Sequence, residues 1–122
     1  MPSRKKSDPR SHLPLKPAVL EILISLGEAD RHGYALLSEI AERTAGRISL
    51  FPAQLYRFLR RMTSDGLIQE VEDRSNRETQ DERRRYYSLT ALGQQVAAAE
   101  LRRLEEVVER GRARFRTVRK AS

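Results

Sequence analysis

The residues between Pro52 and Asp65 carry side chains that suit nucleic-acid recognition. This stretch holds three arginines, a glutamine and a tyrosine, and no acidic residue precedes Asp65. At about 100° of turn per residue, a helix here would place its apolar side chains on one face and its basic side chains on the other. The apolar face would consist of Leu55, Phe58, Leu59 and Met62, and the polar face and its flanks of Gln54, Tyr56, Arg57, Arg60 and Arg61.

Arginine and glutamine can make paired hydrogen bonds to guanine and adenine edges in the major groove. The N-terminal part of an inserted helix usually lies closest to the bases. We therefore predict base contacts from Gln54 and Arg57. Arg60, Arg61 and the Tyr56 hydroxyl are better suited to phosphates, which position a protein without specifying sequence. The alternative is an ordinary solvated helix face, with Tyr56 serving only in packing.

A second basic group, Arg83-Arg84-Arg85, stands directly before the strand-like residues 86–89. Side chains alternate along a strand, so some of these guanidinium groups would point outward beside a duplex. We predict that Arg84 and Arg85 contact the DNA backbone. Acidic residues in the loop 72–85 would repel phosphate, so a salt-bridged loop is the alternative; they include Asp73, Glu78, Asp81 and Glu82.

The sequence offers little for catalysis or metal binding. It contains no cysteine, its only histidines are His12 and His32, and no acidic cluster has metal-ligand spacing. Neither a nucleophile–base pair nor a phosphate-binding glycine loop is present. We predict no enzyme activity, no metal and no cofactor, and we expect His32 to cap or pack against the start of a helix.

Composition favours a polyanionic partner. The 122 residues include 24 Lys and Arg against 17 Asp and Glu, a formal net charge of +7 that is concentrated near the two ends. The length fits one domain. No apolar stretch approaches the roughly 18 residues that would span a membrane, and the basic N-terminus lacks the apolar core of a secretory signal. We predict a cytoplasmic protein without membrane contact.

Apolar periodicity and turn residues predict the order of elements. The predicted helices cover 15–26, 34–46, 52–66 and 91–115, and the predicted strands cover 47–50, 67–71 and 86–89. Gly27 and Gly46 would end the first two helices, and Thr90 would cap the last. The prediction is a mostly α fold with a small β-hairpin (α+β), a winged helix-turn-helix with a long C-terminal helix.

This fold implies four segments. Residues 1–12 are expected to form a disordered basic arm, and residues 13–90 the DNA-binding winged helix-turn-helix. Residues 91–116 would form a dimerisation helix, and residues 117–122 a basic tail.

The last helix carries an apolar stripe with the spacing of a two-helix seam. Its members are Ala97, Leu101, Leu104, Val108 and Phe115. We predict a homodimer held by Leu101, Leu104, Val108 and Phe115, with Leu13, Leu15 and Val19 able to complete the interface. Two-fold pairing would place two DNA-reading helices about one DNA turn apart. The alternative is that the whole stripe packs within one chain.

Two other functions are compatible with the residues alone. A winged helix can dock on protein, and the nearly balanced charge of the central region permits a protein-interaction module. A ligand receptor that needs no DNA is the third possibility. A steep fall of affinity with salt would distinguish DNA binding from both.

Four stretches, in order, resemble the PadR family of bacterial regulators. They are Leu13-Pro-Leu-Lys-Pro-Ala-Val-Leu-Glu-Ile-Leu, His32-Gly33-Tyr34-Ala35-Leu36, Pro52-Ala53-Gln54-Leu55-Tyr56-Arg57 followed by Asp65-Gly66-Leu67-Ile68, and Arg84-Arg85-Tyr86-Tyr87-Ser88-Leu89-Thr90-Ala91-Leu92-Gly93. The resemblance covers roughly residues 13–110 and is closest to the subgroup with a single C-terminal helix.

The resemblance implies a dimeric repressor of transcription that binds double-stranded DNA, with Tyr56 and the basic wing touching the DNA backbone. It also implies that a small effector can bind near the dimer interface and release DNA. Two positions depart from the family pattern. Phe51 occupies the usual polar N-cap position, a loss on the order of 1 kcal/mol, and Ala53-Gln54 replaces the usual Gly-Thr.

Overall fold

The computed structural model describes residues 7–72 and 85–121, with side chains through residue 116. The helices are α1 (Pro17–Glu28), α2 (Gly33–Arg43), α3 (Pro52–Ser64) and α4 (Ala91–Ala121), preceded by a 3-10 helix, η1 (Pro9–His12). The strands are β1 (Arg31–His32), β2 (Ile68–Val71) and β3 (Tyr86–Leu89). The predicted mostly α fold with a small β element is confirmed. Arg84 and residues 1–6 lie outside the described residues.

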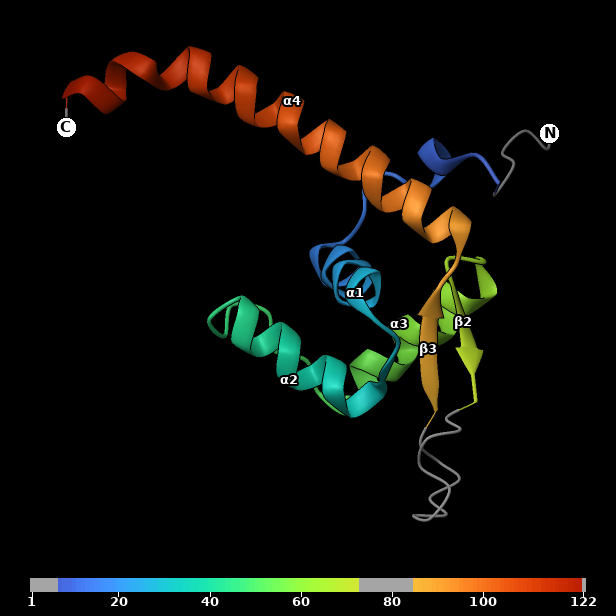
Figure 1. The fold of residues 1–122 in the computed structure, drawn as a ribbon. Coiled ribbons are helices and arrows are strands. Elements are labelled where there is room, and N and C mark those ends of the chain that lie inside the picture. Colours follow the sequence, from blue (N-terminus) through green and yellow to red (C-terminus); the bar gives the residue numbers. More distant parts are fainter. Residues whose placement is uncertain (1–6, 73–84, 122) are drawn as a thin grey trace.

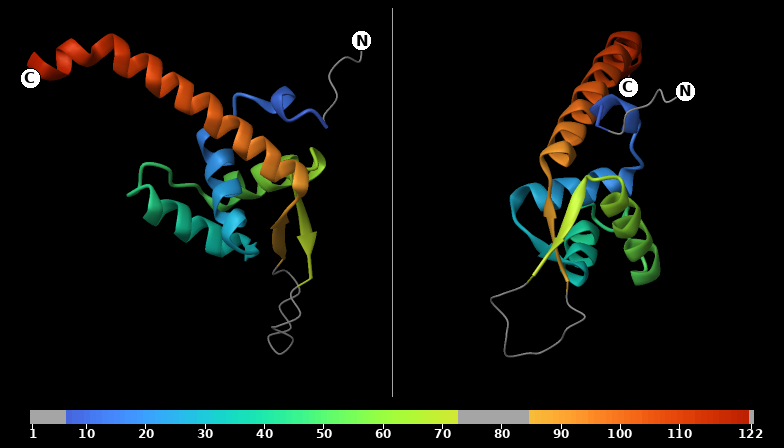
Figure 2. Two further views of the ribbon diagram at one scale, coloured as in Figure 1. Left: turned by 45° about the horizontal axis from the view of Figure 1, so that its top comes forward. Right: turned by 90° about the vertical axis from the view of Figure 1, so that its right-hand side faces the viewer.

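Helices α1, α2 and α3 pack together beside the sheet, and α4 lies across α1 on the side away from α2 (Figure 1). The core forms where the apolar faces of these elements meet, because each helix buries one stripe of side chains. Its fully buried side chains include Ile22, Leu23, Leu36, Ile40, Leu55, Leu59, Ile68 and Val96. The first part of α4 thus belongs to the domain, while its far end projects away from it (Figure 2).

The sheet has three antiparallel strands in the order β1-β3-β2. The predicted hairpin is present, with Ile68 opposite Leu89 and Val71 opposite Tyr86. The predicted strand over 47–50 is wrong, since these residues form a bend and a loop. The third strand is instead β1, in a segment interpreted as a connection, where Arg31 pairs with Tyr87. A two-residue strand has no periodicity to detect, and only β3 beside it makes it a strand.

Left-handed backbone follows both α2 and α3, beginning at Ala45 (φ +54°) after α2 and at Gly66 after α3. Gly46 has φ +78° and Gly66 has φ +81°, a conformation that costs glycine little. The observed helices end two or three residues before the predicted ends, since α2 stops at Arg43 and α3 at Ser64. The prediction that Gly27 ends the first helix is wrong, because α1 continues to Glu28. The extended backbone of Ala29, which leads into β1, ends it instead.

The N-terminal segment is more ordered than predicted. Asp8 accepts a hydrogen bond from the backbone N–H of Arg10 at 3.0 Å and caps η1, which packs against α4. The expected disordered arm over 1–12 is thus wrong for residues 8–12. Leu13, Leu15 and Val19 also pack against the core, so these residues serve the domain itself.

Hydrogen bonds of Thr90 connect the chain just after α3 to the start of α4. The Thr90 hydroxyl lies 2.7 Å from the Gly66 carbonyl oxygen and 2.9 Å from that of Leu67. The same oxygen accepts the N–H of Gly93 at 2.9 Å, which confirms Thr90 as the cap of α4. A Cβ on Gly93 would lie 2.1 Å from the Leu67 carbonyl oxygen, so the close approach of α4 requires glycine there.

Glu100 ties α4 to the chain that enters α1. Its side chain is buried, and its two oxygens accept from the Arg103 guanidinium at 2.6 and 3.0 Å. It also accepts the backbone N–H of Leu15 at 3.0 Å. The hydrogen bond from Arg103, and secondarily that from Leu15, lowers the pKa of Glu100, although burial opposes them. The carboxylate therefore holds residues 13–16 on α4.

We expect Glu100→Ala to lower the free energy of unfolding by about 1–3 kcal/mol, because the partly buried Leu15 N–H loses its acceptor. Urea denaturation at neutral pH measures this. Glu106→Ala, at an exposed position on the same helix, should change it by less than about 0.5 kcal/mol. Equal effects of the two substitutions would contradict the conclusion that Glu100 holds residues 13–16 on α4.

The same substitution has a predicted pH dependence. Because folding depresses the pKa of Glu100 below 4.5, its stabilisation is present above that value. It is lost as pH falls through the lower, folded-state pKa. The gap in stability between the wild type and Glu100→Ala should therefore be constant near neutrality and shrink below about pH 4.5. A gap that persisted unchanged in acid would contradict the assignment.

Candidate nucleic-acid interface

Helix α3 presents the basic face that its sequence predicts. Leu55, Leu59 and Met62 are buried on the inner side. Arg57, Arg60 and Arg61 are exposed on the outer side. Within the described part of the chain, Arg57 and Arg60 have no acidic partner, whereas Arg61 lies 3.4 Å from Asp65 one turn on. The helix therefore offers at least two uncompensated guanidinium groups to solvent.

Gln54 has a structural task at the start of α3. Its Oε1 accepts the backbone N–H of Phe51 at 2.8 Å, so the glutamine closes half of a capping box. Phe51 has no side-chain acceptor for the other half and is 73% exposed. The side-chain oxygen of Gln54 is therefore occupied in this conformation, and its amide N–H groups are the ones that face a partner.

Tyr56 packs across the start of α2. A Cβ on Gly33 would lie 2.4 Å from the Tyr56 hydroxyl and 2.8 Å from its ring, so a side chain at this position would displace the tyrosine. Burial, followed by the neighbouring Tyr34, raises the pKa of Tyr56, with Arg85 acting in the opposite direction. The phenol therefore stays protonated at neutral pH and can donate a hydrogen bond to a phosphate oxygen. Tyr56 is thus partly buried against α2 and partly exposed to solvent.

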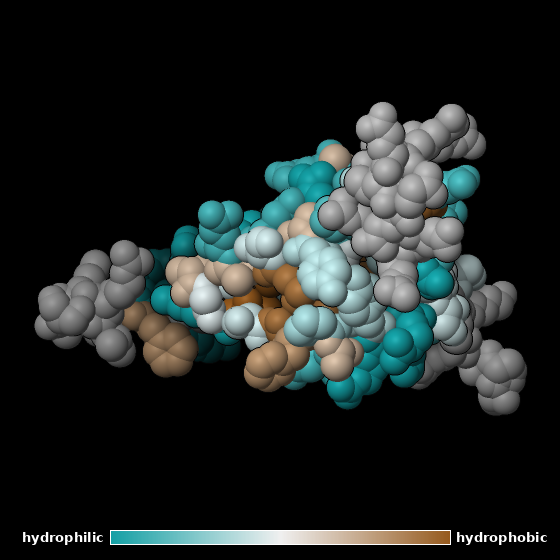
Figure 3. Space-filling model, turned by 90° about the horizontal axis from the view of Figure 1, so that it is seen from below, coloured by the Kyte–Doolittle hydropathy of each residue, from teal (hydrophilic) through white to brown (hydrophobic). Residues whose placement is uncertain are grey.

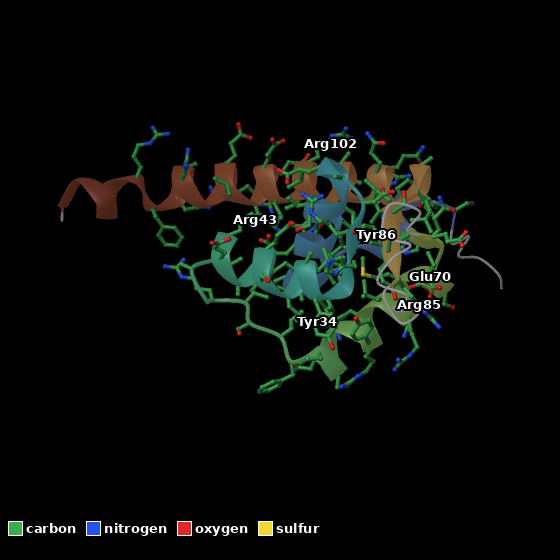
Figure 4. All side chains as sticks on the ribbon, turned by 60° about the horizontal axis from the view of Figure 1, so that its bottom comes forward. Tyr34, Arg43, Glu70, Arg85, Tyr86 and Arg102 are labelled. Carbon is green, nitrogen blue, oxygen red and sulfur yellow. The ribbon has the colours of Figure 1, made fainter. Side chains whose placement is uncertain are left out.

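Tyr56 lines a cavity of about 650 Å³ between α2, α3 and the sheet, which we call the wing-side cavity. Tyr34, at 61% exposure, stands at its α2 edge, and Arg60 borders it from α3. Figure 4 shows Tyr34 beside α3 and Arg85 and Glu70 together on the sheet strands. The residues that line the wing-side cavity are Tyr34, Tyr56, Leu59, Arg60, Thr63, Ser64, Glu70, Arg85 and Tyr87.

Arg85 pairs with an acidic residue that the sequence analysis did not single out. Its Nη1 lies 3.2 Å from Glu70 Oε2 across the β2–β3 pair, and both side chains are substantially exposed. Burial and then the Glu70 charge raise the pKa of Tyr87 in the same cavity. The alternation of β2 places Glu70 on this face, but its partner was not evident from sequence, because the hairpin register decides it.

A second, smaller concavity of about 230 Å³ borders α3 on the opposite flank, and we call it the α1-side cavity. Its lining residues are Lys16, Gln54, Arg57, Phe58 and Arg61. The Lys16 ammonium lies 5.9 Å above the centre of the Phe58 ring, a distance suited to a cation–π contact. Sequence patterns did not point to Lys16, which directly precedes α1 and borders this cavity beside residues of α3.

His32 serves structure, as predicted. Its Nδ1 accepts the backbone N–H of Ala35 at 3.3 Å and caps α2. Its ring meets Tyr86 edge-on at 5.4 Å. Within residues 7–72 and 85–121, no group of three or more His, Cys, Asp or Glu side chains is arranged to hold a metal ion. In the same ranges, no helix is both long and apolar enough to cross a membrane.

Viewed from below, the face formed by α2, α3 and the sheet has hydrophobic atoms at its centre and hydrophilic ones around them (Figure 3). Helix α4 runs along the opposite side of the molecule (Figure 1). The face that includes α3 and the long helix α4 therefore lie on different sides of the protein (Figure 1).

The apolar stripe of α4 is uncovered where the helix leaves the domain. Leu101 is 44% exposed, Val108 49% and Phe115 64%, while Leu104 is half-buried. The helix continues to Ala121, beyond the predicted end, but Phe115 has non-helical angles, φ −106° and ψ 17°. A kink thus falls where the sequence predicts the helix to stop.

A family model described as the transcriptional regulator PadR-like family matches residues 22–99. The chain belongs to this family. It is accordingly a DNA-binding transcriptional regulator with a winged helix fold, as predicted, and PadR-like proteins are regulators rather than an enzyme family. No curated protein matches its sequence.

Solved structures share the fold over most of the chain. A complex structure of hsRosR, a protein of H. salinarum, is 25% identical with a TM-score of 0.67, covering 93% of this chain and 96% of that one. A PadR family regulator from Eggerthella lenta is 27% identical with a TM-score of 0.59, covering 88% and 83%. A transcriptional regulator from Clostridium thermocellum, 22% identical with a TM-score of 0.66 over 80% and 88%, shares the fold.

The Arg85–Glu70 pair predicts that Glu70 weakens DNA binding in this PadR-like chain. We expect Glu70→Gln to bind duplex DNA about threefold to tenfold more tightly at low salt, because the carboxylate no longer opposes an approaching phosphate. Fluorescence anisotropy with a labelled duplex measures the affinity. Glu106→Gln, on α4, is the matched control and should leave it unchanged. Weaker binding by Glu70→Gln would mean that Glu70 instead positions Arg85 for contact.

Proposed function

We propose that this PadR-like protein is a dimeric repressor that reads an operator through α3. The observation that carries the proposal is the exposed set Arg57, Arg60 and Arg61 on α3, of which Arg60 lines the wing-side cavity and Arg57 and Arg61 line the α1-side cavity. Residues 13–90 form the DNA-binding unit and residues 91–116 the dimerisation helix. The protein acts on the chromosome, in the cytoplasm.

In this proposal Arg57 and the amide of Gln54 contact base edges. Arg57 lies in the N-terminal half of α3 and has no acidic partner among the described residues, so its guanidinium is free for a bidentate contact to guanine. Arg60, Arg61, Tyr56 and the wing arginines Arg84 and Arg85 contact phosphates. Arg60, Tyr56 and Arg85 border one cavity, which favours a shared stretch of DNA backbone as their partner.

The dimer is proposed to form through α4. Leu101, Leu104, Val108 and Phe115 share one stripe of this helix, and the exposed members have no covering element in the described chain. Exposed apolar stripes of this kind are typical of helix–helix interfaces. Because α4 lies on the side of α1 away from α2 (Figure 1), a second copy docked there leaves both α3 helices open to DNA.

An effector that releases DNA completes the proposal. Its support is the family resemblance, which implies a small molecule near the dimer interface. The two cavities described above border α3 and not the α4 stripe, so they do not mark that site.

Selection of duplexes from a random library tests the function directly. A regulator enriches one sequence, which we expect to be a palindrome, and its affinity falls steeply with salt because phosphate contacts release counterions. Failure to enrich any sequence, with an affinity insensitive to salt, would favour the protein-interaction alternative.

Arg57→Ala should weaken binding to the selected site by about 1–3 kcal/mol, because a bidentate base contact is lost. Binding to a random duplex should fall much less. Arg60→Ala is the matched control and should weaken binding to both duplexes about equally. If Arg57→Ala also weakens both equally, Arg57 is a phosphate contact and the assignment to base recognition fails.

Val108→Asp should dissociate the dimer, because it places a charge in the apolar seam. Light scattering across a concentration series would then give the monomer mass. Gln95→Asp adds the same charge at another exposed position of α4 and should leave the dimer intact. An unchanged mass for Val108→Asp, with the wild type dimeric, would exclude this seam.

A further inference from the structure

We propose that the α1-side cavity is a second binding site for the DNA backbone, and that Lys16 is its principal phosphate contact. The inference rests on the proposed insertion of α3 into a major groove. It adds a DNA contact from outside α3 and the wing, and it assigns the two flanks of α3 to the two strands that border the groove.

The arrangement of α3 separates the two cavities. At about 100° per residue, Gln54 and Arg61 lie roughly 40–60° to one side of Arg57, and Arg60 and Tyr56 lie roughly 60–100° to the other side. Gln54 and Arg61 line the α1-side cavity, whereas Arg60 and Tyr56 line the wing-side cavity. Each flank of the helix therefore has its own concave, cationic surface.

A major groove presents two backbones to an inserted helix. It is about 12 Å wide and is bordered by one phosphate chain on each side. The wing-side cavity, with Arg60 and Arg85, suits one chain. The other chain must then pass along the opposite flank of α3, where Lys16 and Arg61 line the cavity together with Arg57, the residue proposed to contact a base.

Lys16 is held in place for this contact. The preceding residue, Leu15, donates its backbone N–H to Glu100 of α4 at 3.0 Å, and the next residue, Pro17, begins α1. The Lys16 ammonium rests over the Phe58 ring. Among the described residues it has no acidic partner, whereas Arg61 is partly neutralised by Asp65. The backbone on both sides of Lys16 is therefore held, while its exposed ammonium is available to a phosphate.

The test compares Lys16→Met with the wild type on a selected operator and on a random duplex of equal length. The methionine keeps an apolar chain over Phe58 and removes the charge. We expect roughly fivefold weaker binding to both duplexes at about 0.15 M salt. We also expect the slope of log affinity against log salt to fall by about 0.9, as for one lost phosphate contact.

Two further variants separate charge from packing and from general electrostatics. Lys16→Arg keeps the charge and should bind nearly as the wild type does. Arg102→Ala removes a charge from α4, on the side away from α3 (Figure 4), and should change neither affinity nor slope. Circular dichroism of each variant checks that the fold is retained.

The outcomes are distinguishable. If Lys16→Met keeps the wild-type slope, or if Lys16→Arg binds as weakly as Lys16→Met, this cavity does not hold a phosphate and the inference is wrong. If Arg57→Ala and Arg60→Ala also leave DNA binding unchanged, the proposed function itself fails. A loss confined to the operator would make Lys16 a base contact and would overturn the inference as well.

Discussion

The contact between Thr90, Gly93 and the Leu67 carbonyl fixes the relation between α3 and α4. The Thr90 hydroxyl bonds the chain just after α3 and caps α4 at the same time. Gly93 permits the close approach, since a Cβ would collide with the Leu67 carbonyl oxygen. The helix proposed to read DNA and the helix proposed to pair two copies are therefore set against each other within a few residues. Any dimer formed through α4 then determines where both α3 helices stand.

A few contacts at the start of α2 also hold together the side of the protein that is proposed to face DNA. Gly33 lets Tyr56 lie across α2, His32 caps α2 and touches Tyr86, and Tyr86 belongs to the strand that carries the wing. Helix, turn and sheet are thus connected through the start of α2. The charge presented by this face is modest, because Glu70 and Asp65 each engage one of its arginines. Affinity should accordingly depend on a few unpaired cations rather than on overall charge.

Much of this architecture was predictable because the signals are local. The period of Leu55, Leu59 and Met62 fixed which side of α3 faces inward, and hence which arginines face solvent. Thr90 at the start of the last helix and Gly66 after the third are short-range backbone preferences. The apolar stripe of α4 was visible as spacing alone. The resemblance in four ordered stretches identified the family before any coordinates.

Features that depend on partners distant in sequence were decided only by the tertiary structure. β1 is a strand because β3 lies beside it, and α1 passes Gly27 because the chain becomes extended two residues later to meet that strand. Glu100 is buried because Leu15 and Arg103 satisfy it. Lys16 borders a cavity beside residues of α3 only because the folded chain brings them together. Sequence by itself determines which residues favour helix, turn or surface; the energy of long-range contacts determines which of them meet.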